Sequence, residues 1–148
     1  MEVSQIMSTD LVTVGPEYNV ADVASLMRSR KIGSVIVLED ERVLGILTER
    51  DILGVVVSGE DPKNVAAHEA LTDDLITIGP GAPVEEAANE MVRAQVRHLP
   101  VIENGELIGI VSMRDLLGWS ARGVAESSDL PHIELSKQVL SIVHKAAT

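Results

Sequence analysis

The 148-residue chain contains no cysteine and no phenylalanine, and it has a single tryptophan and a single tyrosine. Without cysteine the chain forms no disulfide bond, has no thiolate nucleophile and offers no thiolate ligand to a metal ion. Hydrophobic residues nevertheless make up 45% of the chain. The interior must therefore be built from Val, Ile, Leu, Ala and Met, with few aromatic surfaces on which a planar ligand could stack.

Positive charge is also scarce, because 12 Lys and Arg stand against 23 Asp and Glu and give a formal net charge of −11. A strongly acidic protein repels phosphate backbones at long range, so we expect no nucleic-acid partner. A small anionic ligand would need a local basic site. The longest apolar runs, such as residues 52–57, are too short to cross a bilayer, and the N-terminus lacks the pattern of a signal peptide. We therefore expect a soluble cytoplasmic protein without a membrane partner.

The sequence shows none of the patterns on which catalysis commonly depends. Its four histidines have no metal-ligand spacing, and there is neither a nucleophile elbow nor a glycine-rich phosphate loop. The carboxylates are spread as on a solvated surface, with no pair that stands out for acid–base chemistry. We predict that the protein is not an enzyme and has no resident metal or cofactor.

What the sequence does have is an internal repeat. Residues 8–54 and 72–118 align in a constant register of 64 without a gap, and 16 of the 47 aligned positions are identical. The identical positions include Leu11/Leu75, Thr13/Thr77, Met27/Met91, Gly45/Gly109 and Asp51/Asp115. Two copies of a unit too small to bury its own apolar face are expected to pack on each other about a pseudo-twofold axis.

Each copy predicts the same order of elements, β-α-β-β-α. In the first copy the hydrophobic pattern predicts strands at 11–14, 34–38 and 43–47 and helices at 20–29 and from 48. The second copy predicts strands at 75–78, 98–102 and 107–111 and helices at 84–93 and from 112, with Asn104-Gly105 as a hairpin turn. The predicted fold class is α/β (α+β): two β-α-β-β-α repeats packed with pseudo-twofold symmetry, plus a C-terminal helix.

The segments around the repeats predict the domain boundaries. We expect the first repeat over residues 1–58, a linker over 59–64, the second repeat over 65–119, and a polar linker with a C-terminal helix over 120–148. Short helices are expected at 2–7 and 64–71, each leading into the copy that follows. Pro131 is placed to begin the last helix, whose apolar face favours packing on the body or on a second subunit, or docking to another protein.

A shared pattern, Gly-h-h-Ser/Thr-x-Arg-Asp with h an aliphatic residue, joins the third strand to the last helix in both copies, at residues 45–51 and 109–115. It directs a hydroxyl, the free N–H groups of a first helical turn and a carboxylate into one small volume. The amides and hydroxyl suit a phosphate, and the carboxylate suits the vicinal hydroxyls of a ribose. The pattern also fits a capping box that only satisfies the helix's own amides, although such a box usually carries Glu or Gln where both copies have Asp. The motif alone leaves both interpretations open.

With these segments the chain resembles the cystathionine-β-synthase-type (CBS) domains in their tandem, stand-alone form. The resemblance covers roughly residues 2–118 and includes the strands at 12–13 and 76–77 and the segment 96–101. It implies a regulatory module that binds adenosine-containing ligands, namely AMP, ADP, ATP or S-adenosylmethionine, in clefts between the copies. It also implies a homodimer and an unidentified partner protein in trans. The candidate dimer face is formed by Ile52, Leu53, Leu116 and Leu117.

The resemblance assigns residues of both copies to each cleft. The first cleft would comprise Thr48, Asp51, Ile76, Thr77, Arg97 and His98. The second would comprise Val12, Thr13, Gly33, Ser34, Ser112 and Asp115. In each cleft the Asp would hold the ribose hydroxyls, the Ser or Thr would hold the phosphate, and backbone groups of the strand with Thr would meet the adenine edge.

The two clefts differ in charge, since Gly33 and Ser34 stand where the other copy has Arg97 and His98. We predict that the first cleft favours phosphorylated adenosine and that the second is weaker or takes a less anionic ligand. Structural roles are the alternative for both residues. Arg97 could form an ion pair with a carboxylate, and His98 could lie in its strand without contacting a ligand. The alternative function is a ligand-free interaction or dimerisation module whose clefts are filled by side chains.

Overall fold

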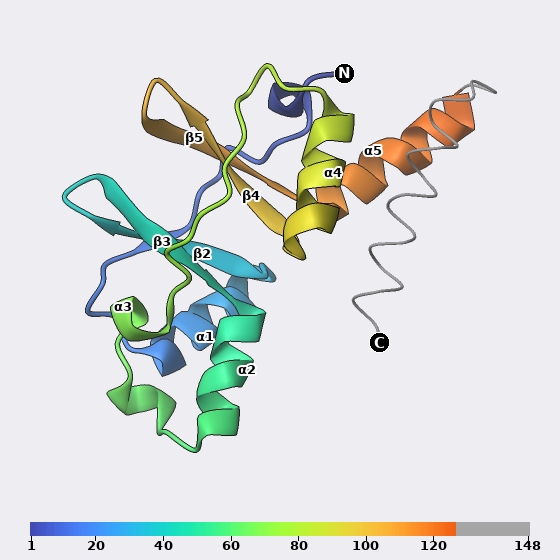
Figure 1. Ribbon diagram of the computed structural model, residues 1–148. Helices are drawn as coiled ribbons and strands as arrows, with labels where there is room; N and C mark the ends of the chain where they lie inside the picture. Colours follow the sequence, from blue (N-terminus) through green and yellow to red (C-terminus); the bar gives the residue numbers. More distant parts are fainter. Residues whose placement is uncertain (127–148) are drawn as a thin grey trace. The chain divides into compact units, whose positions relative to one another are not determined.

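The computed structural model describes residues 1–126 and shows both copies of the repeat (Figure 1). The chain divides into two compact units. The continuous unit consists of Leu11–Leu75, and the split unit consists of Met1–Asp10 together with the residues from Ile76 onward. The C-terminal helix predicted to begin near Pro131 lies outside the described residues.

The continuous unit contains the first copy in the predicted order. Its elements are β1 (Thr13–Val14), α1 (Val20–Arg30), β2 (Ser34–Glu39), β3 (Arg42–Thr48), α2 (Glu49–Ser58), the 3-10 helix η2 (Pro62–Asn64) and α3 (Ala67–Ala70). Strand β2 is central in a three-stranded sheet, parallel to β1 and antiparallel to β3. The predicted β-α-β-β-α order is confirmed in this unit.

The split unit contains the second copy and the N-terminal segment. Its elements are the 3-10 helix η1 (Val3–Gln5), α4 (Val84–Ala94), β4 (His98–Glu103), β5 (Glu106–Ser112) and α5 (Met113–Glu126). Strands β4 and β5 form an antiparallel hairpin in the same register as β2 and β3. The fold is mixed α and β, as predicted.

The first strand predicted for the second copy, at 75–78, is reduced to one parallel bridge between Ile78 and Val101. In the continuous unit the N–H of Ile36 donates to the carbonyl oxygen of Val12 at 3.1 Å and extends the pairing of β1. Pro100 stands at the position equivalent to Ile36 and has no N–H to donate. The prediction of a full strand at 75–78 was therefore wrong, because one proline removes a hydrogen bond from the ladder.

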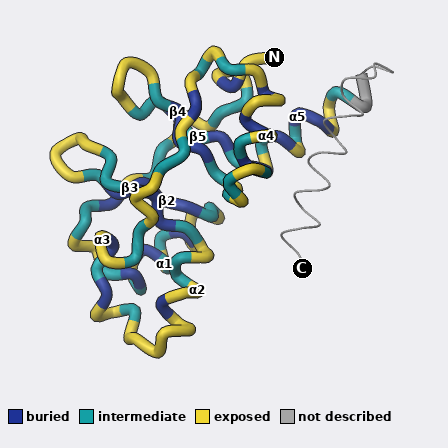
Figure 2. The backbone as a smooth tube through the Cα atoms, in the orientation of Figure 1, coloured by how far each residue is buried: buried dark blue, intermediate teal, exposed yellow. Residues whose placement is uncertain are grey.

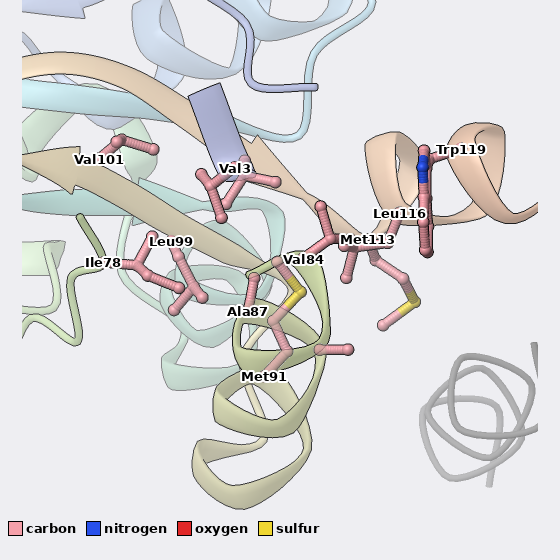
Figure 3. Packing of buried hydrophobic residues seen from close by; sticks show 12 residues of the cluster. Val3, Ile78, Val84, Ala87, Met91, Leu99, Val101, Met113, Leu116 and Trp119 are labelled. Atoms are coloured by element: carbon pink, nitrogen blue, oxygen red, sulfur yellow. The ribbon is translucent and has the colours of Figure 1, made fainter. Parts of the chain in front are cut away.

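Each unit has its own aliphatic core, while the hairpin turns are exposed (Figure 2). The core of the split unit includes Val3 from the N-terminal segment among residues of the second copy (Figure 3). Its other buried members are Ile78, Val84, Ala87, Ala88, Met91, Leu99, Val101, Val111, Met113, Leu116 and Trp119. The main core of the continuous unit consists of Val14, Val23, Met27, Val35, Val37, Leu47 and Ala67. Burial of one large aliphatic side chain contributes about 1.5–3 kcal/mol, so these two clusters are the main source of stability.

Burial separates the four residues that were expected to form a dimer face. Leu116 is completely buried in the core of the split unit, and Ile52, at the equivalent position, is half-buried against the core of the continuous unit. Leu53 and Leu117 are exposed, at 61% and 38%. The expectation was therefore wrong for Leu116, because this position lies on the inward face of its helix.

The lead-in segments of the two copies, residues 3–8 and 67–72, each pack on the opposite repeat. Ser8 exchanges backbone hydrogen bonds of 2.8 and 2.9 Å with Ile110 on β5. At the equivalent position, Thr72 exchanges bonds of 2.9 and 3.1 Å with Ile46 on β3. The compact units therefore change over near residues 10 and 75 and do not coincide with the sequence repeats.

Gly45 and Gly109, which open the two shared patterns, let the lead-in segments approach this closely. A Cβ atom at position 45 would lie 2.5 Å from the carbonyl oxygen of Thr72 and 2.7 Å from Cδ1 of Leu71. At position 109 it would lie 2.6 Å from Sδ of Met7 and 3.0 Å from the carbonyl oxygen of Ser8. Gly45 is therefore required by backbone packing, whereas at Gly109 the closest contact is the Met7 side chain and the backbone contact is tight.

The two hairpins turn through residues in the left-handed region. Asn104 and Gly105 have φ values of 51° and 83°, which confirms the predicted turn. The first copy makes the corresponding turn without glycine, at Asp40 and Glu41 with φ values of 49° and 64°. Non-glycine residues adopt this conformation at a cost of about 1–2 kcal/mol, so the first hairpin holds the more strained turn.

The last helix, α5, continues to Glu126, beyond the end of the repeat. The polar linker predicted from residue 120 was therefore wrong up to residue 126. Trp119 and Ser120 are buried, which anchors the helix where the repeat ends, and no proline occurs before Pro131 to stop it. Within residues 1–126 no helix, α5 included, is long and apolar enough to cross a membrane.

Replacing Gly45 with Ala is expected to destabilise the protein by about 1–3 kcal/mol, because the methyl group would have to displace the backbone of Thr72. Gly54→Ala is the matched control, since a Cβ there meets nothing within 4 Å. Alanine is favoured over glycine in a helix by about 1 kcal/mol, so this control should be at least as stable as the parent. Urea denaturation measures both variants, and equal stability of the two would show that the close approach at Gly45 is not needed.

Candidate functional site

The shared pattern of the first copy lies where β3 ends and α2 begins. Thr48 is the N-cap of α2, and its backbone is extended. Its side-chain oxygen accepts a hydrogen bond from the N–H of Asp51 at 3.4 Å, while Oδ2 of Asp51 accepts from the N–H of Thr48 at 2.8 Å. The Thr48 hydroxyl also donates to Oδ2 of Asp51 at 3.0 Å. The two side chains therefore form a reciprocal capping box.

The second copy forms the same arrangement where β5 meets α5. Oδ2 of Asp115 accepts from the N–H of Ser112 at 2.7 Å and from its hydroxyl at 2.6 Å. The N–H of Asp115 donates back to the Ser112 hydroxyl at 3.3 Å. The capping interpretation is confirmed in both copies, with Asp in the place where Glu or Gln is more usual. It involves Oδ2 in both cases and so uses one face of each carboxylate.

Residues at the start of the second strand lie directly beside this cap in each unit. Ser34 pairs with Thr48 across the β2–β3 hairpin, and the carbonyl oxygen of Gly33 accepts from the N–H of Glu49 at 3.2 Å. In the split unit His98 pairs with Ser112, and the carbonyl oxygen of Arg97 accepts from the N–H of Met113 at 2.9 Å. The hairpin register thus places these positions next to the hydroxyl of the pattern.

The residues assigned to the adenine edge lie at or before the first strand position of each copy, paired with β2 or β4. Thr13 in β1 pairs with Ile36 in β2, and the carbonyl oxygen of Val12 accepts a hydrogen bond from the N–H of Ile36. Ile76 and Thr77 precede the single bridge at Ile78, and Thr77 is exposed.

Each predicted residue set draws on both compact units. Of the first set, Thr48 and Asp51 lie in the continuous unit, and Ile76, Thr77, Arg97 and His98 lie in the split unit. Of the second set, Val12, Thr13, Gly33 and Ser34 lie in the continuous unit, and Ser112 and Asp115 lie in the split unit. Each unit thus contains one part of each set. The assignment of the sets to two clefts stays a prediction.

The cationic residues near the caps differ between the copies. Arg97 is exposed and His98 is half-buried, whereas Gly33 and Ser34 leave the equivalent positions of the continuous unit without charge. On α4, Arg93 forms an ion pair with Glu90, and this hydrogen bond holds the pKa of the Glu90 carboxyl below its ordinary value. Arg93 therefore provides a second cation of the same unit, with a known partner, for comparison with Arg97. Among residues 1–126 no group of three or more His, Cys, Asp or Glu side chains is arranged to hold a metal ion.

Sequence reasoning missed Thr72. Its hydroxyl donates to Oδ1 of Asp51 at 3.2 Å, on the side of the carboxylate that the cap does not use. The signal was present in the repeat, because Ser8 and Thr72 are equivalent hydroxyl residues at the start of the aligned copies. The pairing of Thr72 with the opposite repeat could not be read from that alignment.

Replacing Asp51 or Asp115 with Ala is expected to lower the free energy of unfolding of the ligand-free protein by about 0.5–2 kcal/mol, because the helix loses its cap. Asp74→Ala is the control, since Asp74 is exposed and takes no part in a cap, and its effect should stay within about 0.5 kcal/mol. Asp51→Glu restores the usual capping residue and should keep most of the stability. Urea denaturation gives the values, and Asp51→Ala as stable as Asp74→Ala would contradict the capping role.

Comparison with known proteins identifies the repeat. The family profile of the CBS domain matches residues 3–58 and again residues 67–122. The chain is 38% identical over 120 residues to the uncharacterized protein MK0525 of Methanopyrus kandleri. The aligned region covers 79% of this chain and 61% of MK0525. It therefore spans less than two thirds of the length of this relative.

Solved structures agree with this match. The structure of the CBS-domain containing protein ATU1752 of Agrobacterium tumefaciens has a TM-score of 0.76 at 32% identity. The match covers 83% of this chain and 100% of ATU1752. The CBS domain pair of protein MJ0100, solved in complex with 5′-methylthioadenosine and S-adenosyl-L-methionine, has a TM-score of 0.76 at 20% identity and covers 82% of this chain and 97% of that one. At 20% identity the similarity to the MJ0100 domain pair shows a shared fold only.

Proposed function

Because the chain belongs to the CBS-domain family and carries two CBS domains, we propose that it is a regulatory module that senses an adenosine-containing ligand. The candidate ligands are AMP, ADP, ATP and S-adenosylmethionine. The complex of the MJ0100 domain pair with two adenosine compounds supports this ligand class. The observation that carries the proposal is the duplicated cap, where a hydroxyl, a carboxylate and the start of a helix come together in both units.

The chemistry of the cap suits the two polar parts of such a ligand. The first turn of α2 or α5 presents N–H groups and the positive end of a helix dipole, which favour a phosphate beside Thr48 or Ser112. Oδ1 of Asp51 already accepts a hydrogen bond from an alcohol, the hydroxyl of Thr72. A ribose hydroxyl offers the same donor, so the outer side of this carboxylate is suited to a sugar.

We assign the two residue sets to two ligand sites. The first site comprises Thr48, Asp51, Ile76, Thr77, Arg97 and His98, and the second comprises Val12, Thr13, Gly33, Ser34, Ser112 and Asp115. The Asp residues bind ribose and the hydroxyl residues bind phosphate. Aliphatic side chains enclose the adenine, in keeping with a core that has almost no aromatic residues. Arg97 and His98 give the first site the positive charge that the second lacks.

The proposed output is a shift in population between conformations. A ligand can bias an equilibrium only by binding one state more tightly than another, so the module responds in proportion to that difference. We propose that the signal passes to a partner protein in trans, with the module acting as a homodimer.

One observation favours a second function, a ligand-free interaction module. On α2 the side chains of Leu53, Val56 and Val57 are 61%, 58% and 79% exposed. Large apolar side chains gathered on one element commonly mark a protein contact. In this alternative the caps serve only the helices, and the exposed face of α2 carries the function.

Ligand binding is expected to raise the melting temperature of the protein. A ligand at about 100 times its dissociation constant stabilises the fold by about 2.7 kcal/mol, which corresponds to several degrees. Thermal melting with AMP, ADP, ATP, S-adenosylmethionine and NAD tests this. The double variant Asp51→Glu, Asp115→Glu keeps the caps but moves both carboxylates outward, so it should melt like the parent without ligand and lose the ligand-induced shift. If none of the five compounds moves the melting temperature, the interaction module is favoured.

Arg97→Ala is expected to weaken binding of ATP and ADP about tenfold or more, because a charge-assisted hydrogen bond to phosphate contributes about 1.5–3 kcal/mol. Binding of 5′-methylthioadenosine, which has no phosphate, should change little. Arg93→Ala removes the same charge from the same unit, at a position outside the proposed residue set where the guanidinium pairs with Glu90, and it should leave both affinities unchanged. Isothermal titration calorimetry gives the affinities, and an equal loss for both ligands would contradict a phosphate role for Arg97.

A further inference from the structure

The carboxylate of Asp51 accepts three hydrogen bonds. Oδ2 accepts from the N–H and the hydroxyl of Thr48, at 2.8 and 3.0 Å, and Oδ1 accepts from the hydroxyl of Thr72 at 3.2 Å. A carboxylate offers about four lone-pair positions. Two neighbouring ribose hydroxyls donate two hydrogen bonds, so with the cap intact on Oδ2 the Thr72 hydroxyl must leave Oδ1 before both can bind there.

The Thr72 hydroxyl is the donor that can leave at the lowest cost. Its bond to Asp51 is the longest of the three and is exposed to solvent, whereas both bonds from Thr48 are partly buried. The Thr48 amide cannot leave without opening the cap of α2. The backbone of Thr72 stays fixed by its two bonds to Ile46, so only rotation of the side chain is needed.

We infer that the Thr72 hydroxyl competes with the ligand for Oδ1 of Asp51 and thereby sets the affinity of this site. The inference rests on the proposed function and adds a specificity-determining residue to it. Thr72 acts from the lead-in segment of the opposite repeat, held against β3 by the close approach that Gly45 permits.

The second copy lacks this competitor. Ser8 is equivalent to Thr72, and its backbone pairs with Ile110 in the same way. Within the described part of the chain, however, the Ser8 hydroxyl makes no hydrogen bond to Asp115. The two carboxylates therefore differ in how they receive a sugar. A ligand at Asp51 must bring additional contacts to displace Thr72, such as a phosphate at the first turn of α2.

The test uses the full chain with Asp115→Glu, which keeps the second cap and leaves Asp51 as the ligand-binding carboxylate. Isothermal titration calorimetry with AMP, and separately with S-adenosylmethionine, compares this protein with its Thr72→Val and Thr72→Ser derivatives. Valine keeps the shape and the backbone pairing but removes the hydroxyl. Binding should become about three- to tenfold tighter in Thr72→Val, the equivalent of one exposed hydrogen bond, and stay unchanged in Thr72→Ser.

Ser8→Ala in the same background is the matched control and should leave the affinity unchanged. Weaker or equal binding by Thr72→Val, while the parent binds, would overturn the competition and leave the proposed function standing. If neither probe binds the parent or any derivative, the proposed function fails together with this inference. Binding detected only in Thr72→Val would support the competition most directly.

Discussion

The structure depends on the backbone pairing between each lead-in segment and the third strand of the opposite repeat. The exchange of two hydrogen bonds between Thr72 and Ile46, and between Ser8 and Ile110, covers the outer edge of each hairpin. It brings the chain so close that a Cβ at position 45 would collide with the backbone of Thr72, and it leaves little room for one at position 109. It also makes each compact unit a product of both repeats, since neither repeat holds its own lead-in segment. The glycine that opens the shared pattern thus belongs to the packing of the fold, while the hydroxyl and the acid that follow belong to the cap.

The cap leaves one oxygen of the Asp51 carboxylate available for a second contact. A carboxylate has two oxygens, and the helix start uses Oδ2 in both copies. The other oxygen of Asp51 faces an alcohol from a neighbouring segment. Asp also has a shorter side chain than the Glu or Gln of the usual capping box. It reaches the N-cap amide with one oxygen and, at position 51, turns the other toward the lead-in segment. At position 51 the choice of Asp is consistent with this double use.

Much of the fold followed from the sequence, because the repeat supplied each element twice. The helices near 20–30 and 84–94, both hairpins and the Asn104-Gly105 turn agree with the hydrophobic pattern. The pattern failed where one residue acts through the backbone. Pro100 is apolar and fits the pattern of a strand, but it has no N–H to donate. The parallel pairing with residues 75–78 is therefore reduced to one bridge at Ile78. Leu116 and Leu117 look alike in a sequence, and only the register of α5 against its core buries the first and exposes the second. Of the candidate site, the cap was foreseen as one of two interpretations, whereas Thr72 was missed because its contact joins segments of two different repeats.

The exchange of lead-in segments has a consequence for how the chain acquires its fold. In a protein made from its N-terminus, Leu11–Leu75 forms one compact unit and can fold before the rest of the chain is made. The first ten residues must wait, because Val3 and Ser8 find their partners at Ala82 and Ile110 much later in synthesis. The pairing of Ser8 with Ile110 closes a long loop and is therefore slow to form. Until it forms, the outer edge of β5 is unpaired. Two nascent chains that meet in this interval can trade their N-terminal segments, which makes domain swapping the characteristic misassembly of this architecture.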